Sequence, residues 1–378
     1  YLVKNKIAFA RIVVYLYGSL AHTGEGHKTN AIVSSVLADV SHEVIIDKTT
    51  NPEHPNTMEA VAYLGEAEVI RLVYRSIGGG DVESDIDEAV NVNDVYPFHT
   101  FTEMADYMLD HRIKSIPELV MKFEGKPLMA YLDKVIDTMT ETVAQGIAKE
   151  GTVVHSKSLH VQRRAKELYT DALRTRSPEE KSTLLLSAYA VAAGEENATG
   201  GMVVTAPTCG SAGVISSLVA NEARRFGYSR DKLRKALMTA GMIGNIIKEN
   251  ATVAGAVGGC QAEIGSASAM GAALLCQLKD APLNVIEYAA AHALSDFLGL
   301  TCDPVGGYVI FPCIERNATA VIHAQSAAIY ARSLGNSFAP DMTFDGVVRV
   351  MKETGDAMSP ELKETSLGGM AKHFKDYC

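Results

Sequence analysis

Two segments in the second half of the chain are apolar on every face of the helices that they predict. Residues 265–278 (GSASAMGAALLCQL) and 285–300 (VIEYAAAHALSDFLGL) combine small and aliphatic side chains with few charges. A helix that is polar on one side lies at a protein surface, whereas a helix that is apolar all round lies inside. We therefore expect residues 200–330 to contain the innermost helices of a helical domain, packed closely because many side chains are small.

Four segments before this interior have helical periodicity with charged outer faces: residues 101–121, 127–151, 160–176 and 177–198. The last begins with Ser-Pro-Glu-Glu, which is typical of the start of a helix. We therefore expect residues 98–378 to form one large, all-α domain with these helices outside.

The first part of the chain has a different pattern. Residues 11–20 and 67–80 are rich in β-branched and aromatic side chains and predict strands, while residues 29–40 predict a helix. Residues 81–97 are acidic, poor in apolar side chains and end at a proline, which is typical of a linker. The predicted fold class is α+β, with a small α/β sandwich-like domain over residues 1–97, including the linker, before the helical domain.

Charge and hydropathy exclude several classes of protein. The 378 residues carry a net charge of −10, which argues against a nucleic-acid binder because nothing would neutralise the phosphates. The longest uncharged run, residues 197–221, contains Pro207 and several glycines and is poor material for a membrane span. The first residues carry charges throughout and show no secretory signal. The chain opens on Tyr1 rather than Met, and we expect its natural beginning to lie upstream.

Cysteine is used sparingly, at positions 209, 260, 276, 302, 313 and 378. A long acidic chain without a secretory signal indicates a reducing compartment, so these residues are expected to be buried hydrophobes or metal ligands rather than disulfides. Cys276 lies in the middle of a predicted helix and is expected to serve packing. Cys209 lies in a Pro/Gly turn and is expected to line a cavity.

Cys260, Cys302 and Cys313 have long spacings, unlike the close pairs of zinc ribbons and ferredoxins, so spacing alone is a weak signal. Each of them follows a bend that contains glycine or proline, which lets a thiolate turn toward a shared point. Three thiolates around one cluster leave a metal position open, as a hydro-lyase of the iron–sulfur type needs, because the open iron polarises a substrate hydroxyl. Four cysteines would suit electron transfer instead.

Polar residues in the apolar part gather in four stretches: residues 205–213, 248–265, 301–317 and 364–371. A buried charge needs a partner. The charged residues Lys248, Glu249, Glu315 and Arg316 are therefore expected to form internal ion pairs or to line a polar cavity.

These stretches resemble the iron–sulfur L-serine dehydratases, also called L-serine ammonia-lyases. The resemblance is carried by ENATVAGAVGGCQAEIGSASAMGAA, LGLTCDPVGGYVIFPCIERNA, ETSLGGMA and TAPTCGSAGV, and it covers roughly residues 185–378. It is fainter over residues 98–184, where LHVQRRAKELY matches but VVHSKS replaces the family's Leu-Pro-Gly-Gly.

The first part of the chain resembles the β, or regulatory-type, domain of the same family. The matching segments are VYLYGSLAHTGEGHKTNAI (14–32), HPNTM (54–58) and YRSIGGG (74–80). Two departures stand out. Lys28 replaces the usual glycine after His27, and the family's Ser-Ser-His-Thr segment, which normally precedes this region, is absent. The second departure indicates either a truncated chain or a different handling of substrate.

The resemblance implies a [4Fe–4S] cluster held by Cys260, Cys302 and Cys313, with the fourth iron reserved for substrate. Cys378, the last residue, is implied to fold back onto that iron as a removable, self-inhibitory ligand. The implied reaction converts L-serine to pyruvate and ammonia without pyridoxal phosphate. The implied partner is the small molecule L-serine, with no nucleic acid and no membrane, and the implied protein is a cytoplasmic homodimer.

This reaction needs a base for the poorly acidic Cα proton and groups that hold the substrate. His27, in a glycine-flanked loop able to project into a cleft between domains, and Lys248 are the two candidates for the base. Thr208, Asn250, Arg316 and Asn317 are candidate ligands for the substrate ammonium and carboxylate, since arginine is the natural partner of a carboxylate.

Two other functions remain open from the sequence. An L-cysteine desulfidase of related architecture would use the open iron for a substrate thiolate. A non-catalytic metal-binding or regulatory protein would use the cysteines structurally, for example with zinc. A pyridoxal-phosphate enzyme is disfavoured, because no helix start follows the glycine run at 78–80 and no lysine stands in a Schiff-base context.

Overall fold

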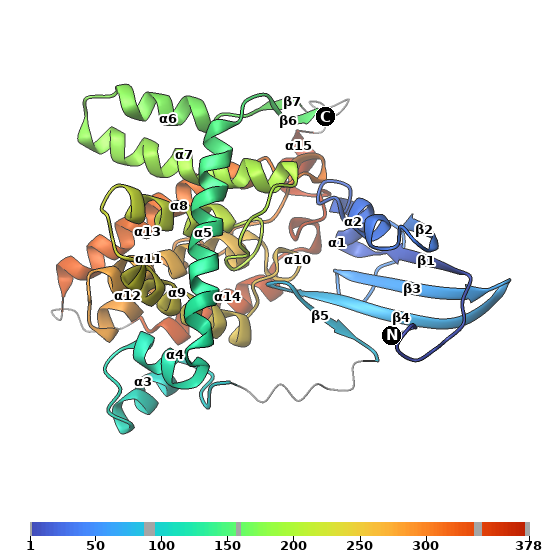
Figure 1. Cartoon of the computed structure of the whole chain (residues 1–378), viewed down its shortest axis with the longest axis horizontal. Helices are drawn as coiled ribbons and strands as arrows, with labels where there is room; N and C mark the ends of the chain where they lie inside the picture. The colour runs from blue at the N-terminus through green and yellow to red at the C-terminus, as the bar shows by residue number, and fades with distance from the viewer. Residues whose placement is uncertain (1, 87–94, 156–159, 336–341, 375–378) are drawn as a thin grey trace.

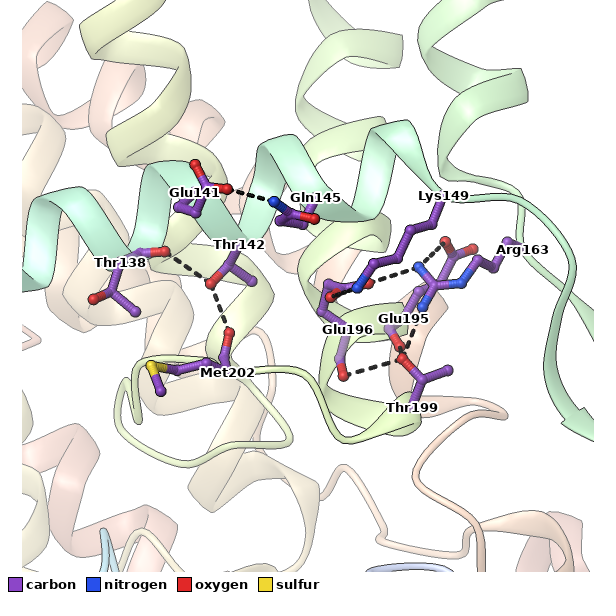
Figure 2. A network of polar contacts seen from close by, with 10 residues as sticks. All are labelled: Thr138, Glu141, Thr142, Gln145, Lys149, Arg163, Glu195, Glu196, Thr199 and Met202. Carbon is purple, nitrogen blue, oxygen red and sulfur yellow. Dashed lines mark hydrogen bonds and ion pairs between the residues drawn. The ribbon is translucent and has the colours of Figure 1, made fainter.

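A computed structural model describes residues 2–86, 95–155, 160–335 and 342–374. In this part of the chain a small sheet domain precedes a mostly helical domain, as the predicted α+β class requires (Figure 1). The sheet has the strand order β2-β1-β3-β4-β5; β1 pairs with β2 in parallel and the other pairs are antiparallel. Its strands are β1 (Arg11–Leu16), β2 (Ser41–Ile46), β3 (Thr57–Leu64), β4 (Ala67–Gly78) and β5 (Asp81–Ser84).

Two short helices, α1 (Gly18–Thr23) and α2 (Thr29–Val36), connect the parallel strands β1 and β2. Alternate residues of β1, Ile12, Val14 and Leu16, are buried on the face of the sheet that carries α2. This period of two explains why the β-rich run after residue 11 forms a strand with one apolar face. The chain then enters α1 at Gly18, so the predicted strand 11–20 ends earlier than expected.

The helical domain is built around α11 (Ser266–Leu278), every residue of which is buried. It packs against α8 (Ala212–Arg224), α9 (Arg230–Asn250), α12 (Leu283–Ser295) and α13 (Cys313–Leu334). Small residues allow this close approach; at Gly271, for example, an added Cβ would lie 2.9 Å from Leu218 Cδ1. The prediction that the 200–330 segment forms the interior is confirmed.

Amphipathic helices surround this interior: α3 (Phe101–Asp110), α4 (Ile116–Glu124), α5 (Pro127–Ala148), α6 (Ala165–Arg174) and α14 (Phe344–Ala357). α7 (Pro178–Thr199) differs from the expected outer helix, because it is exposed mainly in its first turns and is buried on nearly all sides from Leu185 to Glu196. Several of these helices start where a hydroxyl caps the first turn, because the Ser or Thr oxygen accepts a hydrogen bond from a backbone N–H that lacks a helical partner. Ser177, for instance, accepts from the Glu180 N–H at the start of α7, as the Ser-Pro-Glu-Glu signal predicted.

Short elements complete the domain: α10 (Gly255–Gly258), the π-helix η1 (Gln261–Gly265), the 3-10 helices η2 (Val305–Gly307) and η3 (Pro360–Leu362), and α15 (Gly369–His373). Figure 1 shows the sheet beside the helical body, with α1 facing α10 and α15. Contacts of α1 with η2 join the two parts. Among the described residues no helix is both long and apolar enough to cross a membrane.

Two details differ from the predicted domains. The segment expected to be all-helical contains the antiparallel pair β6 (Thr152–His155) and β7 (His160–Gln162). The segment 81–97, expected as a linker, begins with β5, because residues 81–84 pair with β4 and extend the sheet. At its other end Tyr96 already packs against Phe98 and Phe123 of the helical domain. Residues 87–94 of the expected linker lie outside the described residues.

Candidate metal centre

A cavity of about 660 Å³ lies where the sheet domain meets the helical domain. Its wall comes from the loop before α2, the end of α7 and the following turn, η1, the segment between Cys302 and Cys313, and Glu364. These segments are far apart in sequence. The four polar stretches that stood out in the sequence each contribute at least one residue to this wall.

The structure brings Cys260, Cys302 and Cys313 together in this region, and all are buried. The Cys260 and Cys302 sulfurs and a carboxylate oxygen of Glu263 all lie within 4.8 Å of one another. A hydrogen bond with Cys260, together with burial, raises the pKa of the Cys302 thiol. Burial raises the pKa of the Cys313 thiol, and the neighbouring Cys260 raises it further.

Local backbone features explain how these thiols converge. Cys260 ends the bend after α10 and directly precedes η1; a π-helix inside a helical run is frequently found at functional sites. Cys302 forms a parallel bridge with Lys363, which joins the 301–317 stretch to the 364–371 stretch. Cys313 begins α13. Cys260 and Cys313 therefore stand where helices begin, and Cys302 lies in the irregular segment between α12 and η2, so all three follow the glycine or proline bends noted in the sequence.

This donor set fits a soft metal group. Thiolates favour zinc and iron–sulfur clusters among biological metals. Cys260 contributes to the raised pKa of both Cys302 and Cys313 because adjacent thiolates repel, and a bound cationic group would remove this repulsion. The structure is therefore consistent with a metal centre at these cysteines.

Two carboxylates that were not singled out from the sequence also line the cavity. Glu263, on η1, accepts a hydrogen bond of 2.6 Å from the Thr208 hydroxyl. Burial and the neighbouring Glu364 raise the pKa of Glu263 to about 7. Gly255 leaves room for this carboxylate, because a Cβ there would lie 2.6 Å from Glu263 Oε2. The position of Glu263, three residues after Cys260, is the signal in the sequence that could have identified this carboxylate.

Glu364 has a backbone φ of 58°, in the left-handed region that most residues avoid. Its N–H donates to the Cys302 carbonyl at 2.6 Å, and its own carbonyl accepts from the Ser19 hydroxyl at 2.9 Å. Burial raises the pKa of its carboxyl group to about 7. Glu364 thereby connects the sheet domain with the segment that carries Cys302.

His27 projects into the cavity between the domains, as predicted. Its Nε2 lies 3.5 Å from Glu364 Oε1, and its side chain is about a quarter exposed. Burial lowers the pKa of His27, which favours the neutral imidazole. The loop that carries it lies tightly against the helical domain, because a Cβ on Gly26 would overlap the Gly307 carbonyl.

The ion pairs of Lys248, Glu249 and Glu315 are partly exposed rather than internal, whereas Arg316 is largely buried and lies beside Cys260, which raises the pKa of Arg316 against the effect of burial. Lys248 pairs with Asp81 of β5 and is not among the residues that line the cavity. Arg316 donates to the Thr301 carbonyl at 2.6 Å and to Asp303 Oδ1 at 3.2 Å. Glu249 pairs with His99 and Glu315 with Arg164.

The two asparagine candidates have structural contacts. Asn250 donates to the carbonyls of His99 and Ile246 at the end of α9. Asn317 donates to the Gly210 carbonyl at 2.8 Å and thereby fixes the 205–213 turn against α13. Neither is among the cavity-lining residues. Of the four predicted substrate ligands, only Thr208 reaches the cavity wall.

The remaining cysteines lie where their context predicted. Cys276 is fully buried in α11, with its sulfur 3.9 Å from the Ala328 carbonyl. Cys209 is exposed and lines the cavity. Cys378 lies outside the described residues.

Comparison with known proteins finds a matching family model and several similar proteins. Residues 46–371 match a family model described as the serine dehydratase alpha chain. The chain is 32% identical over 413 aligned positions to an L-serine dehydratase of Escherichia coli K12, covering 96% of this chain and 90% of that protein. It is 34% identical over 414 positions to an L-serine dehydratase of Streptomyces coelicolor, covering 96% and 89%. It is 34% identical over 416 positions to one of Helicobacter pylori J99, covering 97% and 90%.

Proposed function

Since the chain belongs to the L-serine dehydratase family, we propose that it converts L-serine to pyruvate and ammonia with a [4Fe–4S] cluster and without pyridoxal phosphate. The observation that carries the proposal is the meeting of Cys260, Cys302 and Cys313 beside a cavity that His27, Thr208 and Glu263 also line. The homodimeric state and cytoplasmic location implied by the resemblance remain predictions.

In this proposal Cys260, Cys302 and Cys313 hold the cluster, and the role of Cys378 as a removable ligand stays a prediction from the sequence. When bound, the cluster supplies a Lewis-acidic iron that makes the serine hydroxyl a better leaving group. The thiols come from elements fixed by the helical core, so the centre needs little rearrangement on loading.

His27 is the base in this proposal, and Lys248 is not, because its ammonium is paired with Asp81 outside the cavity wall. Nε2 of His27 faces Glu364, so Nδ1 is the atom that accepts the Cα proton. The electrons of the broken Cα–H bond form the Cα–Cβ double bond as the Cβ–O bond breaks. The hydroxide that leaves becomes water with a proton that the His27 imidazolium ultimately returns. The aminoacrylate produced tautomerises and is hydrolysed to pyruvate and ammonia. The Glu364 carboxylate then stabilises the imidazolium.

The substrate ammonium group is held by the acidic side of the cavity. Glu263 and Glu364 both line it, and Thr208 fixes the Glu263 carboxylate through its hydroxyl. A cation placed between two carboxylates favours their ionised forms, so the ammonium and the carboxylates stabilise one another. Asn250, Arg316 and Asn317 have no part in this binding.

The test is turnover by the full chain after anaerobic reconstitution with iron and sulfide. We expect pyruvate and ammonia from L-serine in equal amounts, and far less sulfide from L-cysteine. Sulfide release from L-cysteine without pyruvate from L-serine would favour the desulfidase. A chain that binds the metal but turns over neither amino acid would favour the non-catalytic protein.

A further inference from the structure

The proposed function leaves the substrate carboxylate without a partner. A carboxylate that leaves water needs a cation or several N–H donors. Arg316, the candidate from the sequence, is hydrogen bonded to Asp303 and the Thr301 carbonyl, and Lys248 is paired with Asp81. Within the part of the chain that the structure describes, Lys28 is the one lysine or arginine that lines the cavity.

Lys28 has a free ammonium group in a suitable place. Its side chain is exposed, and among the described residues no carboxylate pairs with it. Its Nζ lies over the C-terminal end of α7, since a Cβ on Gly200 would be only 3.0 Å from it. Lys28 directly precedes α2 in the sheet domain, and its Nζ reaches Gly200 at the end of α7. The side chain therefore extends across the mouth of the cavity to the opposite wall.

The charges around the cavity are arranged for a zwitterion. Glu263 and Glu364 provide the negative side, beside the cysteines. Lys28 provides the positive side, at the mouth next to Gly200. An α-amino acid carries an ammonium and a carboxylate on the same carbon, and this layout places a partner of opposite charge on each side of it.

We propose that Lys28 binds the substrate carboxylate and thereby selects α-amino acids, an inference that rests on the proposed function. The competing structural role is stabilisation of the C-terminal end of α7, where the helix dipole favours a cation. Lys28 occupies the N-cap position of α2, but its side chain makes no capping hydrogen bond. Its φ of 57° lies in the left-handed region, where glycine would be less strained.

The experiment measures the binding of two small ligands to the reconstituted full chain by calorimetry. L-Alanine has the ammonium and carboxylate but no hydroxyl, and ethanolamine has the ammonium and hydroxyl but no carboxylate. Lys28→Gly and Lys28→Met are compared with Lys28→Arg, which keeps the charge. Lys48→Met is the matched control, because Lys48 is an exposed lysine of the sheet domain outside the cavity wall.

We expect Lys28→Gly and Lys28→Met to raise the Kd of L-alanine at least about tenfold, and to change the Kd of ethanolamine less than about twofold. Lys28→Arg should keep L-alanine binding within about threefold of wild type, and Lys48→Met should change neither ligand. Lys28→Gly should not lower the melting temperature, because it relieves the positive φ.

Three results would overturn the proposal: no binding of L-alanine by the wild-type chain, an unchanged Kd for L-alanine in both charge-removing variants, or equal weakening of both ligands. Equal weakening of L-alanine and ethanolamine binding would mean that Lys28 only holds the end of α7 in place. Ligand binding is measured separately from the turnover of L-serine. A wild-type chain that binds L-alanine through Lys28 but forms no pyruvate from L-serine would contradict the dehydratase and leave this assignment standing.

Discussion

At the scale of single residues, the cavity combines a histidine with lowered basicity and two carboxylates of raised pKa. Burial is the largest cause in each case: it lowers the pKa of His27 and raises those of Glu263 and Glu364 to about 7. The three groups lie close enough to share one substrate-sized space. Strongly shifted groups that gather in a cleft are typical of active sites.

Replacing His27 by alanine tests the base directly. We expect kcat for L-serine to fall by about 10²–10⁴ with little change in KM, because the variant loses proton transfer and keeps the groups that hold the substrate. His42→Ala, in β2 and outside the cavity wall, is the matched control and should retain wild-type kcat. A kcat close to wild type in His27→Ala would exclude His27 as the base.

The pH dependence has a defined sign. The base acts in its neutral form, so kcat/KM falls as the pH drops through the pKa of His27 in the free enzyme. Burial lowers that pKa from its ordinary value of about 6.5. Glu263 and Glu364 must also be ionised to hold the substrate ammonium, and their pKa values are about 7. We therefore expect kcat/KM to fall first near pH 7 and then more steeply below about pH 6.5, as His27 is protonated. A midpoint above about pH 7 that disappears in His27→Ala would contradict the assignment.

The cysteines should differ sharply in reactivity. Burial raises the pKa of Cys276 to about 12, so its thiolate is scarce at neutral pH, whereas Cys209 is exposed in the cavity wall. In the folded, reconstituted chain we expect iodoacetamide to label Cys209 and spare Cys276, as read by peptide mass spectrometry. Equal labelling of the two would show that the cavity or the packing around α11 differs from the structure described.

Local context predicted the roles of individual cysteines better than those of charged residues. Cys209 and Cys276 lie as expected because a turn or a mid-helix position depends on the neighbouring sequence. For Lys248 the sequence left an ion pair and a place in the cavity wall both open, because its partner, Asp81, is distant in the chain and belongs to the sheet. Glu364 was overlooked because its link to Cys302 is a backbone contact that no sequence pattern reveals.

At the scale of elements, the segment between β1 and α2 carries His27 and Lys28 to the cavity. The segment lies against η2 at Gly26. Any residue with a side chain at this position would overlap the Gly307 carbonyl. The Ser19 hydroxyl adds a hydrogen bond to the Glu364 carbonyl. These contacts, rather than the sheet itself, set where the proposed base stands relative to the cysteines.

Gly26→Ala therefore tests the docking of this segment. We expect the added methyl group to displace the loop and to lower kcat by about a hundredfold, since small misplacements of a catalytic group have large effects. Iron content should stay at the wild-type level because Cys260, Cys302 and Cys313 all belong to the helical domain and are buried there. Unchanged turnover would mean that the Gly26–Gly307 contact does not position His27.

Gly241→Ala is the matched control for this change. Gly241 lies within α9 with open space around its Cβ position, so alanine should stabilise the helix by about 0.5–1 kcal/mol and leave kcat unchanged. Thermal unfolding and serine turnover measure the two effects. A destabilised Gly241→Ala would show that the surroundings of α9 are more crowded than described.

The elements themselves were predictable where their periodicity is strong. α11 was expected to be interior because its apolar residues surround the helix, and all of it is buried. The β6–β7 pair was not expected, because two strands of three and four residues leave too short a pattern to separate from a loop. β5 was taken for part of the linker because its residues are acidic, and only its pairing with β4 makes it a strand.

At the scale of the whole molecule, function depends on two domains meeting at one cavity. The helical domain supplies Cys260, Cys302 and Cys313, and the sheet domain supplies His27 and Lys28. The family resemblance predicted which segments matter, but the sequence could not show how the domains face each other. That arrangement follows from contacts of α1 with η2 and of Ser19 with Glu364.

The iron, acid-labile sulfide and zinc content of the anaerobically reconstituted chain decides whether Cys260, Cys302 and Cys313 hold a cluster. We expect about four iron and four sulfide per chain, without zinc, for wild type and for Cys276→Ser. We expect a large loss of iron and sulfide in Cys302→Ser, measured on protein with an unchanged circular dichroism spectrum. Zinc without sulfide in the wild-type chain, or full iron and sulfide in Cys302→Ser, would contradict the assignment of the cluster to these cysteines.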